Sequence, residues 1–107
     1  MKIYKLSNMS LFSYDNDLYF KSIDNAKNEL MNNLNQLLSQ YSDHIAPISI
    51  FNSYVQELNK DKDMKIIYNN YPILIHKERK SIYGTILTYE NDDVNILGYT
   101  INEEKLN

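Results

Sequence analysis

Residues 22–41, SIDNAKNELMNNLNQLLSQY, decide the fold because their apolar side chains recur at the period of a helix. Spacings of three and four place these side chains on one stripe of about five turns. Ser22 stands where an N-cap hydroxyl accepts a backbone N–H, and Asp24 puts a carboxylate in the first turn. The segment therefore predicts one helix over residues 23–41, with a core-facing stripe of Ile23, Ala26, Leu30, Leu34, Leu37, Leu38 and Tyr41.

A second, shorter helix is predicted over about residues 49–59. Pro47 separates it from the first helix, because a residue that precedes proline avoids the helical region. Its apolar face is made of Phe51, Tyr54, Val55 and Leu58.

The segments on both sides of the helices are rich in Ile, Tyr, Val and Thr and are separated by polar turns, which is typical of strands. We expect strands at residues 2–6, 11–14 and 18–20 before the helices, and at 64–68, 73–76, 82–90 and 94–101 after them. Gly84 and Gly98 stand alone within strands and indicate a bulge or a close backbone approach. The prediction is a single α+β domain over residues 1–107: an N-terminal hairpin and a C-terminal antiparallel meander form a sheet that one long and one short helix cover on one face.

Composition fits one globular domain. The 107 residues are 43% hydrophobic and 23% charged, with a formal net charge of −3, which favours no class of partner. No apolar run is long enough to span a bilayer and the first residues lack the apolar core of a signal peptide, so we expect a cytoplasmic protein with no membrane contact. The absence of cysteine excludes disulfides, thiol catalysis and cysteine-ligated zinc.

The chain offers no catalytic motif. Its two histidines, His44 and His76, have no third nitrogen or sulfur ligand at a metal-binding spacing. The glutamates after residue 77 form no paired-carboxylate pattern, and no glycine-rich loop could hold a phosphate. We therefore predict that the protein is not an enzyme and uses no metal or cofactor.

Two features could form binding surfaces. The loop at residues 77–80 places Lys77, Arg79 and Lys80 at a hairpin end, where they could contact phosphates or an acidic protein patch, although charged hairpin tips also serve solubility. The last two strands carry apolar residues on both parities, so either both sheet faces are covered or one is a partner surface with the anchors Tyr83, Tyr89 and Tyr99. The codon bias of an AT-rich genome could also explain the abundant tyrosine.

In length, lack of cysteine, mild acidity and arrangement of elements, the chain resembles the small anti-defence proteins of phages and mobile elements, such as anti-CRISPR inhibitors. The resemblance covers overall character and carries over no residue. It implies inhibition by occupying the surface of a nuclease or nucleoprotein complex. Three hypotheses follow: a protein-binding inhibitor or immunity protein, a nucleic-acid-binding accessory or regulatory protein that uses the basic loop, and a subunit that pairs with itself.

Overall fold

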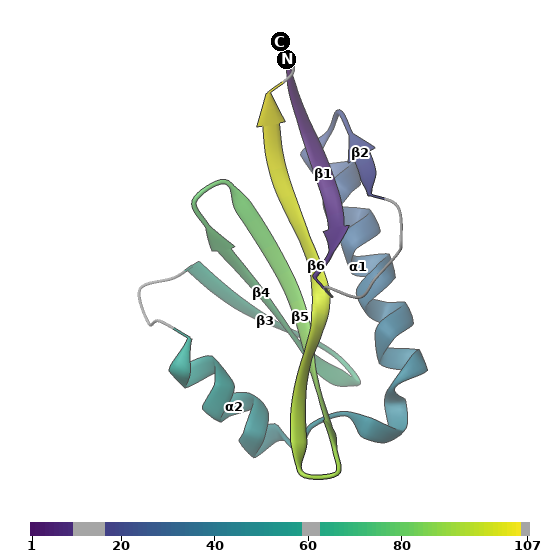
Figure 1. Ribbon diagram of the computed structural model, residues 1–107, viewed down its shortest axis with the longest axis vertical. Coiled ribbons are helices and arrows are strands. Elements are labelled where there is room, and N and C mark those ends of the chain that lie inside the picture. Colours follow the sequence, from purple (N-terminus) through teal and green to yellow (C-terminus); the bar gives the residue numbers. More distant parts are fainter. Residues whose placement is uncertain (10–16, 59–62, 106–107) are drawn as a thin grey trace.

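Six strands form one antiparallel sheet in the order β2-β1-β6-β5-β4-β3 (Figure 1). The computed structural model describes residues 1–9, 17–58 and 63–105. Its elements, in chain order, are β1 (Lys2–Asn8), β2 (Leu18–Phe20), α1 (Ile23–Gln40), the 3-10 turn η1 (Ser42–His44), α2 (Ile48–Glu57), β3 (Asp63–Asn69), β4 (Tyr71–Glu78), β5 (Ser81–Glu90) and β6 (Asp93–Lys105).

The predicted α+β class and both helices are confirmed, and six of the seven predicted strands are present. The seventh, at residues 11–14, lies outside the described residues. The division into a hairpin and a separate meander is wrong in detail. β1 pairs with β2 on one side and with the end of β6 on the other, from Lys2 opposite Lys105 to Asn8 opposite Tyr99. The first and last strands are thus neighbours in one continuous sheet.

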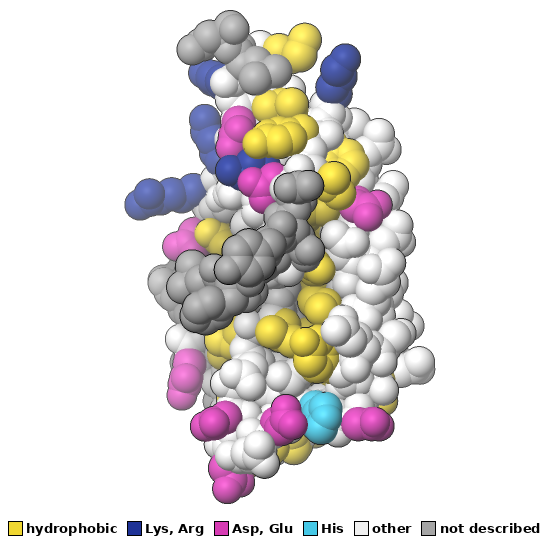
Figure 2. Space-filling view, turned by 45° about the vertical axis from the view of Figure 1, so that its right-hand side comes forward, with side chains coloured by type: hydrophobic (Ala, Val, Ile, Leu, Met, Phe, Trp, Pro, Cys, Tyr) yellow, Lys and Arg dark blue, Asp and Glu magenta, His cyan; other side chains and the backbone are white. Residues whose placement is uncertain are grey.

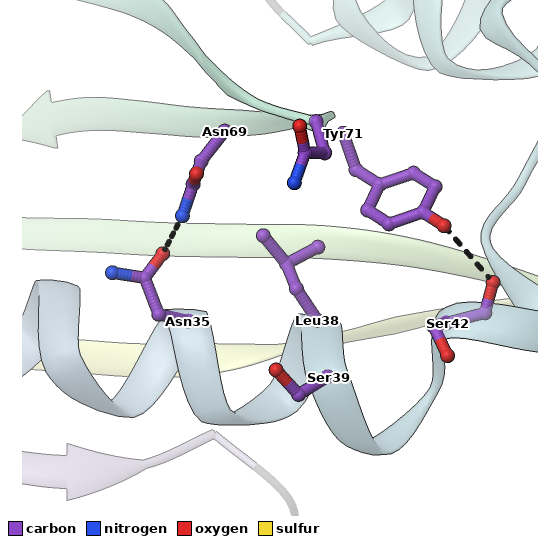
Figure 3. Close-up of a pocket in the computed structure, with 7 residues that line it drawn as sticks. Asn35, Leu38, Ser39, Ser42, Asn69 and Tyr71 are labelled. Atoms are coloured by element: carbon purple, nitrogen blue, oxygen red, sulfur yellow. Dashed lines mark hydrogen bonds between the residues drawn. The ribbon is translucent and has the colours of Figure 1, made fainter.

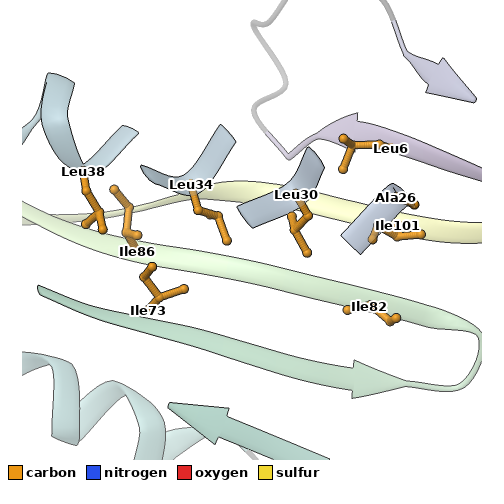
Figure 4. Close-up of a cluster of buried hydrophobic side chains, with 9 residues drawn as sticks. All are labelled: Leu6, Ala26, Leu30, Leu34, Leu38, Ile73, Ile82, Ile86 and Ile101. Atoms are coloured by element: carbon orange, nitrogen blue, oxygen red, sulfur yellow. The ribbon is translucent and has the colours of Figure 1, made fainter. Parts of the chain in front are cut away.

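Helix α1 begins and packs as its sequence predicts. The backbone N–H of Asn25 donates to the Ser22 hydroxyl at 3.4 Å, which is the expected N-cap. The buried residues of the helix lie one turn apart and cover the sheet, whose side chains meet them from below (Figure 4). This main core contains Leu6, Ala26, Leu30, Leu34, Leu38, Ile73, Ile82, Ile86 and Ile101.

Helix α2 lies on the opposite face of the sheet, so the prediction that one face carries both helices is wrong. Phe51 of α2 packs with Leu74 and Leu87 in a second buried cluster. Each of these two leucines follows an isoleucine of the main core, Ile73 or Ile86. Successive strand residues point to opposite faces, so the two clusters are on opposite sides. The apolar residues on both parities are therefore explained by cores on both faces.

The chain crosses between the faces through a gap between β4 and β5. These strands pair only from Leu74 opposite Thr85 to the hairpin end, so the other half of β5 is free of β4. Ile45 forms an isolated bridge with Thr88 there, and the Ala46 N–H donates to the Leu87 carbonyl at 2.9 Å. The residues between the helices thus cross from one face of the sheet to the other, and they form hydrogen bonds with backbone groups of β5 that β4 does not reach.

Gly98 marks a close backbone approach, as predicted, whereas Gly84 faces side chains. A Cβ on Gly98 would overlap the carbonyl oxygen of Gly84 on the neighbouring strand. A Cβ on Gly84 would instead meet the methyl end of Leu34. The Leu34 side chain can change its rotamer to make room for a methyl group, but the backbone of β5 cannot move aside in this way. Gly98 is therefore the glycine that sets how closely β5 and β6 approach.

Shortening a leucine of the α1 stripe tests the main core. Leu34 is completely buried. We expect Leu34→Ala to lower the free energy of unfolding by about 2–5 kcal/mol, because the variant buries less apolar surface and leaves a residual cavity. Urea denaturation of the variant and the parent measures this. A variant as stable as the parent would mean that this face of α1 does not pack on the sheet.

The glycine pair gives a second test, by thermal melting. Gly98→Ala should lower Tm by more than Gly84→Ala, because the added methyl forces two backbones apart at position 98. Gly84→Ala serves as the matched control, since it adds the same methyl group to the adjacent strand. Equal melting temperatures for the two variants would contradict the close approach of β5 and β6.

Candidate functional site

The β5–β6 turn is tight and fixed by its own residues. Glu90 pairs with Asp93, which leaves Asn91 and Asp92 as a two-residue connection. Both have positive φ, 53° and 64°, as a type I′ hairpin turn requires, and Asn and Asp tolerate this conformation. The Tyr89 hydroxyl donates to the Asp92 carboxylate at 3.1 Å. The end of the hairpin is therefore an ordered structure.

Next to this turn, β6 exposes two large apolar side chains on the face that carries α2. Val94 is 44% exposed and Ile96 is 45% exposed. They pair with Tyr89 and Leu87 of β5, and directly paired residues share a face. We call Tyr89, Val94 and Ile96 the hairpin surface. The Tyr89 side chain is half-buried and packs against the second core cluster, which joins this surface to the core.

Charge is separated along the molecule, and the hairpin surface is at the acidic end. Figure 2 shows acidic side chains gathered at the lower end and Lys and Arg side chains toward the upper end. The exposed carboxylates of Glu90, Asp92 and Asp93 flank the hairpin surface, and Asp43 of η1 adds a fourth exposed acid. No described residue in 81–104 is a lysine or arginine. The net charge of the whole chain is only −3, but the end that carries the hairpin surface has a local excess of negative charge.

The structure does not bring the three predicted tyrosine anchors onto one surface. Tyr83 and Tyr89 are on the α2 face, whereas Tyr99 pairs with Gly84 and packs against the α1 core. Tyr83 stacks on His76 with ring centroids 4.8 Å apart. All three are half-buried. Sequence reasoning noted apolar residues on both parities of the last two strands but singled out the tyrosines. Only the register and the burial show that Val94 and Ile96 are left exposed.

The basic loop lies at the opposite end of the sheet. Lys77, Arg79 and Lys80 are exposed at the β4–β5 turn, and Arg79 has a positive φ of 57°, which is uncommon for a side chain of this size. The Lys80 ammonium lies 3.8 Å from a carboxylate oxygen of Glu103, which also pairs with Lys2. Part of the loop's charge is thus neutralised within the chain.

Ion pairs of Lys5 neutralise more of the positive charge at that end of the sheet. Lys5 pairs with Glu104 at 3.4 Å and with Asp17 at 3.9 Å. The hydrogen bond from Lys5 to Glu104 and the attraction of the carboxylate charge raise the pKa of Lys5 above its ordinary 10.5. This lysine remains protonated throughout the physiological range and serves the fold.

Three lysines meet around a shallow pocket of about 200 Å³ between α1 and the β3–β4 pair. Lys27 and Lys65 join the predicted Lys77 there, and Asp63 is the acidic residue of the lining. Ile75 and Ile82 provide apolar walls. The three lysines are far apart in the sequence, so this grouping could not be predicted. It forms because α1 packs on the sheet. Such a pocket suits an anionic group.

A larger cleft of about 450 Å³ lies where the β3–β4 turn meets the end of α1 (Figure 3). Asn69 donates through its side-chain amide to the Asn35 oxygen at 2.6 Å, and the Tyr71 hydroxyl reaches the Ser42 carbonyl at 3.5 Å. Its lining is neutral, with amides, hydroxyls and Leu38. These contacts hold the β3–β4 turn against α1. This structural role is sufficient to explain why the cleft is lined by polar residues.

Metal clusters and membrane-spanning helices are both lacking in the part of the chain that the structure describes. Within residues 1–9, 17–58 and 63–105, no three His, Asp or Glu side chains gather in a way that could hold a metal ion. None of the helices in these same ranges has the length and apolar character needed to cross a membrane.

Comparison with protein-family models, with curated proteins and with solved structures gave no match to this chain. The surfaces of the molecule are therefore the basis for a functional proposal.

Proposed function

We propose that this protein is a non-catalytic binding protein that acts by occupying a surface of another protein through its hairpin surface. The observation that carries the proposal is the exposure of Val94 and Ile96, 44% and 45%, side by side on one strand. Exposed apolar groups are common singly, but a row of them on a rigid hairpin with a half-buried tyrosine at its base has the composition of an interface centre.

The surrounding charge indicates the chemistry of the partner. Glu90, Asp92 and Asp93 form an acidic rim, and no described residue in 81–104 is a lysine or arginine that could compensate it. A partner with lysines or arginines around an apolar depression would complement both features, and rim charges of this kind raise the association rate and select the partner. The nucleic-acid groove of a nuclease is one such surface, in line with the resemblance to anti-defence inhibitors.

The test compares two isoleucines of similar exposure. Ile96 is on the hairpin surface, and Ile66 of β3, 37% exposed, is the matched control at a distant strand. Proteins from the native host are captured on the tagged parent, on Ile96→Asp and on Ile66→Asp, and the retained protein is purified for calorimetry. We expect Ile96→Asp to weaken binding about thirtyfold or more, since it buries a carboxylate at the interface centre, while Ile66→Asp binds like the parent.

Melting temperature is the control for folding, because a residue whose substitution lowers stability and affinity together belongs to the core. A partner that Ile96→Asp retains as tightly as the parent would show that the hairpin surface is not the binding site. Equal weakening with both variants would show that binding depends on general surface polarity.

Nucleic-acid binding is the second candidate, because the fold gathers Lys27, Lys65 and Lys77 around one pocket. In addition, Arg79 and Lys80 extend the positive region to the hairpin end. These five side chains could contact phosphates in succession. The net charge of −3 and the pairing of Lys80 with Glu103 make this the weaker proposal.

Salt dependence separates the two functions. If DNA or RNA is the partner, replacing Lys27, Lys65 and Lys77 with Gln should flatten the slope of log K against log salt by about 0.7–0.9 for each phosphate that the variant no longer neutralises. A second variant, with Arg79 and Lys80 both replaced by Gln, tests whether the loop makes its own contribution to nucleic-acid binding. Retardation assays over a salt series measure both slopes, and an unchanged slope in both variants removes the basic region from consideration.

A further inference from the structure

In the part of the chain that the structure describes, the hairpin surface coincides with an open sheet edge. β1 pairs with β6 only as far as Asn8 opposite Tyr99, and the Met9 N–H donates to the Gly98 carbonyl at 3.0 Å. Beyond that point, no described strand lies beside residues 93–97 of β6 on this side. Among the described residues, the position that β1 occupies along one half of β6 is therefore open along the other half.

The direction of the backbone groups at this edge follows from the crossing segment. Ala46 donates to the Leu87 carbonyl from the side of β5 that faces away from β6. Backbone groups alternate in direction along an antiparallel strand, so those of Thr88 point toward β6. Thr88 pairs with Asn95, whose N–H and C=O therefore point toward β5.

The residues on either side of Asn95 must then direct their N–H and C=O groups outward. These residues are Val94 and Ile96. The bond from Met9 to the carbonyl of Gly98, two positions further on, has the same outward direction and agrees with this alternation. The two residues that expose apolar side chains thus also direct their backbone donors and acceptors toward the edge where no described strand lies.

We propose that the partner protein adds an extended segment as a new strand along residues 93–97 of β6. This inference rests on the proposed function and specifies how the hairpin surface is used. Backbone hydrogen bonds to Val94 and Ile96 would supply part of the affinity, and apolar side chains of the incoming strand would cover the two exposed residues. The acidic rim of Glu90, Asp92 and Asp93 selects a segment that carries lysine or arginine.

The other sheet edges suit this role less well. β2 has only three residues. β3 also exposes Ile66 and Tyr68, but it carries Lys65 next to its central residue, a charge of the kind that blocks edge pairing and would repel a basic segment. A second copy of the chain also fits poorly. Antiparallel pairing of two β6 edges about Asn95 would place Asp92 of one copy opposite Gly98 of the other, where Met9 already lies.

Amide hydrogen exchange, followed by NMR on the full chain, tests this proposal. In the free protein, Val94 and Ile96 should exchange faster than Asn95 and Leu97, which pair with β5. The probe is a blocked peptide of about six residues with alternating lysine and valine, the length of a common strand. We expect it to slow exchange at Val94 and Ile96 by about tenfold or more, with no change at β3.

The control peptide has the same side chains but an N-methyl group on every residue, which removes the backbone donors of both edges and prevents strand pairing. It should leave exchange at Val94 and Ile96 unchanged. Equal protection by both peptides, protection only at β3, or no protection with either peptide would overturn strand addition. Slowing at Val94 and Ile96 that grows with protein concentration alone would assign the edge to a second copy and contradict the proposal.

The same measurement with the captured partner separates this inference from the proposed function. A partner that Ile96→Asp weakens, but that leaves exchange at Val94 and Ile96 fast, would support the hairpin surface and overturn strand addition. A partner that is insensitive to Ile96→Asp would overturn the proposed function itself.

Discussion

The hydrogen bond from Ala46 to Leu87, 2.9 Å long, marks the constraint on which the rest of the structure depends. The chain must pass from the α1 face of the sheet to the other face, and it does so where β4 has separated from β5. A crossing segment would otherwise leave backbone groups of β5 without partners in a buried place. Ile45 and Ala46 act as a short substitute for the missing part of β4, which allows one six-stranded sheet to carry a helix on each side.

Two consequences follow for function. The sheet has cores on both faces, and Val94 and Ile96 are among the large apolar side chains that stay exposed, together with Leu18, Tyr19, Ile48, Ile66 and Tyr68. Near the crossing, β5 and β6 continue as a two-stranded ribbon whose outer edge has no described partner, and Val94 and Ile96 are on that edge. The basic and acidic ends of the molecule are far apart along its long axis (Figure 2), so a partner can be selected by one end alone.

Periodicity and turn chemistry were sufficient to predict the helices and most strands from sequence. The α1 stripe has its own cap, and Asn91 and Asp92 suit the positive φ that their turn requires. Periodicity could not show which face of the sheet α2 covers. Apolar residues at alternate strand positions indicate that a face is buried, but they do not indicate which helix buries it. The mixed parity of β5 and β6 was the available signal. The pocket of Lys27, Lys65 and Lys77 could not be predicted, because it depends on packing between residues distant in the chain.

The central claim, that the helices pack on opposite faces, is tested most directly by nuclear Overhauser contacts from the ring of Phe51. The chain has only three phenylalanines, so selective labelling makes this ring simple to assign. The structure requires contacts from the ring to the methyl groups of Leu74 and Leu87 and none to Ile73 or Ile86, which belong to the α1 core. Contacts from Phe51 to Ile73 or Ile86 would place both helices on one face and contradict the account.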